Sequence, residues 1–111
     1  MAQLNSSDEK KISPLPGMLL QCAVVCERCF ASAGRDARWF KECADICRET
    51  AEMLTESFFI FPGMLDACAS RCTECSVECQ YMSVSEQYMA CTMSCMNCAM
   101  ACREQVLAIM N

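Results

Sequence analysis

Residues of similar character recur along this chain with the period of an α-helix in four separate stretches. The clearest stretches are 68–79 and 91–102, where cysteines recur at steps of four, three and four residues and other side chains, many of them polar, fill the positions between. At about 100° per residue, such positions fall within roughly 60° of arc on one helix face, whereas a strand would repeat every second residue. Two shorter cysteine rows, at 22–29 and 43–47, follow the same steps. The pattern predicts four amphipathic helices, each with cysteines along one face.

Residues that favour turns and caps indicate where these helices end. Gly34 can end the first helix, Pro62 separates the second from the third, and Ser83 or Ser85 can cap the fourth. We expect helices over about 17–33, 36–57, 63–82 and 85–110. Short connections between helices of similar length favour neighbours that run in opposite directions. The prediction is an all-α fold: an antiparallel up-down-up-down four-helix bundle with a cysteine-lined core over 17–111, preceded by a flexible N-terminal segment over 1–16.

Composition and charge restrict the partners of such a bundle. The 111 residues include 13 cysteines and 10 methionines but no histidine, and the net charge is −5. An acidic chain without a cluster of Lys or Arg is a poor partner for nucleic acid or an anionic membrane. The longest apolar stretch, 18–25, is too short to span a bilayer, and the polar N-terminus does not resemble a secretory signal. We therefore expect a cytoplasmic protein whose thiols are kept reduced.

Neither ordinary core packing nor disulfide bonding explains the cysteine rows. Free cysteine behaves as a small buried hydrophobe, but a column of cysteines fills too little volume in each layer of a bundle. Residues three or four apart on a helix have Cβ atoms about 5–6 Å apart, whereas a disulfide needs about 3.5–4.5 Å. Disulfides between rows would leave one of the 13 cysteines over, and a reducing cytosol opposes them. We therefore interpret the rows as metal ligands.

The ligand type and spacing favour Cu(I). Thiolates select Cu(I), Zn(II) or iron–sulfur clusters, but a straight helical row cannot wrap around a cluster, and 13 thiols do not divide into separate four-thiolate zinc sites. Cu(I) accepts two or three thiolates, and a CxxxC pair can hold one ion at metal–sulfur distances of about 2.3 Å. A thiolate sink for Zn(II) or Cd(II) and a cysteine-based redox sensor stay open as alternatives. The candidate ligands are the cysteines, with three methionines that extend the rows: Cys22, Cys26, Cys29, Cys43, Cys47, Cys68, Cys72, Cys75, Cys79, Cys91, Cys95, Cys98, Cys102, Met18, Met64 and Met82.

These motifs resemble a known family, the cysteine-lined four-helix-bundle copper storage proteins. The resemblance extends from Cys22 to Arg103, and its most specific parts are CxxxCxxCxxxC at 68–79 and at 91–102, with ECADICRETAEML at 42–54. It implies that all 13 cysteines bind multiple Cu(I) ions along the bundle axis. It also implies a homo-oligomer, usually a homotetramer, and no enzymatic activity.

A second row of sulfur runs along the fourth helix. Its members lie on the side opposite the cysteines and are Met89, Met93, Met96 and Met100. Thioethers suit Cu(I), so this row could be a second copper track. Methionine also fills adaptable apolar contacts, and we favour an interface with another subunit.

Aromatic residues suggest which end of the bundle is closed. Phe58, Phe59 and Phe61 lie between the second and third helices, and we expect them to cover that end of the core. Copper would then enter at the other end, past Met82. Trp39 and Thr50 are expected to complete the inward face of the second helix as ordinary core.

Overall fold

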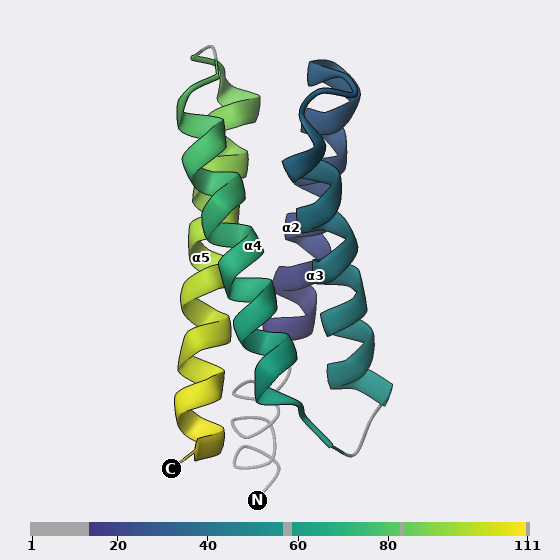
Figure 1. The fold of residues 1–111 in the computed structure, drawn as a ribbon, viewed down its shortest axis with the longest axis vertical. Coiled ribbons are helices and arrows are strands. Elements are labelled where there is room, and N and C mark those ends of the chain that lie inside the picture. Colours follow the sequence, from purple (N-terminus) through teal and green to yellow (C-terminus); the bar gives the residue numbers. More distant parts are fainter. Residues whose placement is uncertain (1–13, 57–58, 83, 111) are drawn as a thin grey trace, which may run out of the picture.

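The structure, a computed structural model, describes residues 14–56, 59–82 and 84–110. Four helices account for nearly all of them: α2 Pro14–Ala33, α3 Arg38–Glu56, α4 Pro62–Gln80 and α5 Glu86–Met110. Figure 1 shows them side by side, each running opposite to the next. Every helix packs against two neighbours, in the order α2, α3, α4, α5 and back to α2. The predicted all-α antiparallel bundle is confirmed.

The helix boundaries follow local chemistry. Gly34 adopts the left-handed conformation (φ 92°) after α2, and its N–H donates to the carbonyl of Phe30 at 3.0 Å. At α5, the hydroxyl of Ser85 accepts a hydrogen bond from the N–H of Tyr88 at 3.2 Å, as an N-cap residue does. Ser83, the other expected cap, lies outside the described residues.

Helix α2 begins at Pro14, slightly before the expected position. A proline is compatible with the first turn of a helix, since its missing N–H would have no partner there. The earlier start brings Leu15 onto the buried face. Of the predicted N-terminal segment, residues 1–13 lie outside the described part of the chain.

The bundle has two different ends. The double-loop end carries the α2–α3 and α4–α5 connections, and the single-loop end carries the α3–α4 connection (Figure 1). At the single-loop end the core is closed by buried aliphatic side chains, which are Leu15, Leu19, Leu65 and Val106. At the double-loop end Phe40 is fully buried, and its ring stacks on that of Tyr88 with centroids 6.0 Å apart. Apolar residues therefore close the cysteine rows at both ends.

The expected aromatic seal at the single-loop end is wrong for the residues that the structure describes. Phe59 and Phe61 are 73% and 56% exposed, and Phe58 lies outside the described residues. The reason is helical register, because Leu65 lies three residues before Cys68 and so on the same helix face. Leu65 therefore fills the core between the cysteines of α4 and the single-loop end.

Exposed ion pairs link neighbouring helices. Arg48 of α3 binds Glu27 of α2 through two contacts of 2.6 and 3.0 Å. Arg71 of α4 reaches Glu42 of α3 at 2.7 Å. Such exposed pairs contribute about 0–1 kcal/mol each, so the stability of the bundle depends on its core. No helix in the described part of the chain is long and apolar enough to cross a membrane.

Candidate metal centre

All 13 cysteines are free and buried, and they come together along the axis of the bundle. Each row faces inward because its cysteines share one face of their helix. Each row has a larger buried apolar side chain at one of its ends: Leu19 before Cys22, Phe40 before Cys43, Leu65 before Cys68 and Val106 after Cys102. The rows predicted from sequence are therefore confirmed as the interior surface of the bundle.

The thiols of Cys26 and Cys95 each contact several other sulfur atoms of the array. The sulfur of Cys26 lies 3.7 Å from that of Cys91, 3.7 Å from that of Cys95 and 3.9 Å from that of Cys75. The sulfur of Cys95 also lies 3.7 Å from that of Cys22. Helices α2, α4 and α5 thus share one group of sulfur atoms.

Helix α3 extends the array toward the single-loop end. The sulfur of Cys43 lies 3.8 Å from Cys95 and 3.7 Å from Cys72. The sulfur of Cys47 lies 3.6 Å from Cys72 and 3.9 Å from Cys68. Sulfur therefore follows sulfur at van der Waals distance along much of the bundle.

Within this array, three groups of four thiols could each surround a metal ion. In each group all four sulfur atoms lie within 4.8 Å of one another. The groups are Cys22, Cys26, Cys43 and Cys95; Cys22, Cys43, Cys47 and Cys72; and Cys26, Cys75, Cys91 and Cys95. They overlap, because Cys22, Cys43, Cys26 and Cys95 each belong to two groups. Neighbouring ions would therefore have to share thiolates.

The sulfur spacing already suits a metal ion. With metal–sulfur bonds of about 2.3 Å, thiolates around one ion stand about 4.6 Å apart in a linear site, about 4.0 Å in a trigonal site and about 3.8 Å in a tetrahedral site. The observed contacts of 3.6 to 3.9 Å lie below the trigonal value and bracket the tetrahedral one. The sulfur atoms are therefore already about as far apart as ligands of a single ion.

Burial and mutual contact control the ionisation of the thiols. Burial, with the neighbouring Cys91 next in importance, raises the pKa of Cys29 to about 12. The hydrogen bond with Cys75, followed by that with Cys91 and by burial, raises the pKa of Cys79. Contact with Cys22, followed by burial, raises the pKa of Cys98. A metal ion that binds these groups must displace protons, so binding weakens as pH falls.

Thiols near the ends of the array also donate to the backbone. Cys98 donates to the carbonyl of Met18 at 3.3 Å, and Cys29 donates to the carbonyl of Gln87 at 3.6 Å. Both bonds run between α2 and α5 and fix the direction of the donating side chain. They orient two outlying thiols that the four-thiol groups do not include.

The three candidate methionines lie in different surroundings. Met18 and Met82 are half-buried and pack against the core. Met64 is also half-buried, but it lines a surface hollow with Met53 and several acidic residues of α3. Leu65, and not Met64, continues the cysteine row of α4 inside the core.

The sequence interpretation missed one fully buried residue of the inward face of α3. Phe40, and not the expected Trp39, is the fully buried aromatic residue. Phe40 stands three residues before Cys43 and therefore on the same helix face, so the sequence pattern could have identified it as buried. Thr50 is fully buried as expected, but its hydroxyl lacks a hydrogen-bond partner.

The geometry defines a class: a four-helix protein whose core is a metal-binding array of thiols. Comparison with protein families then matches residues 8–107 to the family described as Csp: Copper storage protein. The chain belongs to the copper storage protein family. Comparisons with curated proteins and with solved structures found no match.

Proposed function

We propose that this protein stores Cu(I) as a cluster of ions bridged by the thiolates of its core. The observation that carries the proposal is the overlap of the four-thiol groups along one continuous array. Sharing of thiolates between ions suits a soft ion of low coordination number such as Cu(I). Storage within the bundle would keep a redox-active ion away from water.

Zinc is the main competing cargo. Structural zinc sites are closed sets of four ligands, and separate sites would each need their own thiols. The three groups together contain only eight different cysteines: Cys22, Cys26, Cys43, Cys47, Cys72, Cys75, Cys91 and Cys95. They cannot be filled as three independent zinc sites. A shared cluster of Cu(I) uses the array more fully.

A redox sensor fits the structure less well. Sensor cysteines are accessible and carry a lowered pKa beside basic groups. Here every thiol is buried, and the pKa of outlying thiols such as Cys29 is raised. Oxidants would reach these groups slowly.

The proposed ligand set comprises the cysteines of all four rows. Met18 and Met82 extend it, because both pack against the core beside the end thiols. Met64 would have to turn inward from its surface hollow, so its role as a ligand stays a prediction of the sequence alone. Reducing surroundings such as a cytoplasm suit an array of free thiols.

We also propose that the protein works as a homo-oligomer. Met89, Met93, Met96 and Met100 are between 47% and 63% exposed along α5. A row of exposed thioethers is adaptable apolar surface. Met96 and Met100 can pack against another copy, whereas Met89 and Met93 line a pocket beside Cys79.

Titration of the reduced protein with Cu(I) against a competing chelator tests the proposed storage function. We expect on the order of six to ten ions for each chain, depending on how many thiolates bridge. Zn(II) and Cd(II) titrations serve as controls, and should saturate at fewer ions with weaker retention. Binding of only one or two Cu(I) ions, or preferential filling by Zn(II), would contradict storage of copper.

A further inference from the structure

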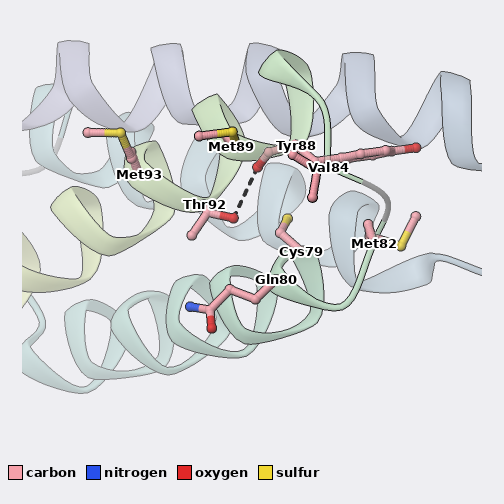
Figure 2. Close-up of a pocket in the computed structure, with 8 residues that line it drawn as sticks. All are labelled: Cys79, Gln80, Met82, Val84, Tyr88, Met89, Thr92 and Met93. Carbon is pink, nitrogen blue, oxygen red and sulfur yellow. Dashed lines mark hydrogen bonds between the residues drawn. The ribbon is translucent and has the colours of Figure 1, made fainter.

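The structure offers a lateral approach to the thiol array at Cys79. Both ends of the axis are closed by apolar side chains, including Phe40 and Leu19. Cys79 is 3% exposed, the largest exposed fraction among the cysteines. Cys79 also lines a pocket on the side of the bundle, between α4 and α5 (Figure 2).

This pocket is rich in sulfur and contains no charged side chain. It encloses about 240 Å³ and is lined by Cys79, Gln80, Met82, Val84, Tyr88, Met89, Thr92 and Met93. Figure 2 shows Cys79 rising from α4 into the pocket, Met89 and Met93 arriving from α5, and Met82 on the side of the connection that follows α4. Three methionines and one cysteine therefore line the same pocket.

The pocket joins the outer methionine row of α5 to the cysteine row of α4. Met89 and Met93 belong to the outer row and are 57% and 63% exposed. Cys79 is buried and ends the cysteine row of α4, four residues after Cys75. An ion held by the thioethers would thus lie beside a chain of thiols that leads inward.

Thioethers suit the first capture of a soft monovalent cation. They coordinate Cu(I) and carry no proton that must leave before binding. Their flexible side chains can turn toward a common ion, since methionine has three rotatable bonds. Harder, strongly hydrated cations such as Mg²⁺ and Ca²⁺ bind through carboxylate oxygens. The pocket has no charged side chain, so it does not suit them.

We propose that the pocket formed by Met82, Met89, Met93 and Cys79 is a lateral capture site through which Cu(I) enters and leaves the array. The inference rests on the proposed storage of Cu(I). During transfer, a copper–thioether bond breaks and a copper–thiolate bond to Cys79 forms. The proton of the thiol passes to water, and the oxidation state of copper does not change. Movement further inward is then exchange between neighbouring thiolates.

Matched variants on the same row of α5 test the site. Met89→Leu with Met93→Leu removes two thioethers from the pocket at nearly constant volume. Met96→Leu with Met100→Leu makes the same change further along the row, at residues that do not line the pocket. Transfer of Cu(I) from a coloured chelator should be several-fold slower in the first double variant and unchanged in the second. Equal rates in the two variants, whether slowed or not, would overturn the inference.

The methionine methyl groups give a direct readout of binding. In protein labelled with ¹³C at these methyls, the first equivalent of Cu(I) should shift the resonances of Met82, Met89 and Met93 and leave those of Met96 and Met100 in place. If all members of the row shifted together, copper would bind along the whole row and not in the pocket, and the inference would be wrong. Shifts at none of them would overturn it as well. The number of ions bound at saturation reports separately on the storage function, because the first double variant should keep the capacity of the wild type.

Discussion

The rings of Phe40 and Tyr88 are stacked, with centroids 6.0 Å apart and planes inclined by 14°. They come from α3 and α5 and lie one turn beyond the first cysteines of those rows. Phe40 is fully buried, so this pair covers the axis at the double-loop end. The end that the sequence suggested as the open one is therefore closed by an aromatic pair.

Phe40→Ala should destabilise the metal-free bundle strongly. Truncation of a fully buried phenylalanine costs about 3–5 kcal/mol through lost burial and the cavity left behind. Phe61→Ala is the matched control: Phe61 is 56% exposed, and its truncation should change the free energy of unfolding by less than about 0.5 kcal/mol. Chemical denaturation of both variants measures the difference. Similar losses in the two would contradict the special role of Phe40 in closing the core.

Thr50→Val should stabilise the metal-free protein. The hydroxyl of Thr50 is fully buried without a hydrogen-bond partner, and such a group costs about 1–3 kcal/mol. Valine keeps the shape and removes the hydroxyl, so we expect a gain of about 1 kcal/mol in the free energy of unfolding. Thr50→Ser retains the hydroxyl and should not stabilise. A loss of stability in the valine variant would show that the hydroxyl has a partner in solution.

Removal of a central thiol should cost more copper than removal of a peripheral one. Cys95 belongs to two of the overlapping groups, whereas Cys102 belongs to none. Cys95→Ala should therefore lower the number of bound Cu(I) ions more than Cys102→Ala, with helical content unchanged in both by circular dichroism. Metal analysis after gel filtration gives the count. Equal losses would indicate that copper fills isolated pairs and not a shared cluster.

Alkaline pH should destabilise the metal-free fold, partly through Cys29. Its pKa rises from 9.0 to about 12 in the folded protein, chiefly because of burial. The folded state then keeps a proton that the unfolded state loses, so this contribution is complete below pH 9 and is lost as pH rises toward 12. Cys29→Ala should show a shallower decline of unfolding free energy over that range than the wild type. Parallel declines would show that Cys29 ionises alike in both states.

The sequence predicts the thiol array well because the physical signal is simple. Steps of four, three and four place Cys91 and its successors on one face of a helix, whatever that face contacts. Four such faces can be buried together only in a bundle. The rows, the fold class and the free thiols follow from these steps.

The ends of the bundle were harder to predict, because several apolar residues compete for each end. Leu19 and Met18 are neighbours in the chain, and both lie near the face of Cys22. The structure buries Leu19 completely and Met18 only in part. Packing against the other helices decides between them, and a single helix carries no information about that packing. The same holds for Leu65 and Met64.

The lateral pocket could not be predicted from either sulfur row alone. Cys79 and Met89 belong to different helices and to opposite faces of the pattern. They come together because α4 ends and α5 begins close by, with a short connection between them (Figure 1). The sequence shows which residue types form each row. Only the packing of α4 against α5 brings residues of the two rows into one site.

The interleaving of sulfur on α5 also determines which genetic changes the protein tolerates. Every methionine of the outer row stands two residues before a cysteine of the inner one: Met89 with Cys91, Met93 with Cys95, and so on to Cys102. Loss or gain of two residues near the start of α5 would turn the rest of the helix by about 200°. The thioethers would then face the core and the thiols would face solvent. Single substitutions leave this division intact, whereas an insertion or deletion of two residues would exchange the inside of the helix with its outside.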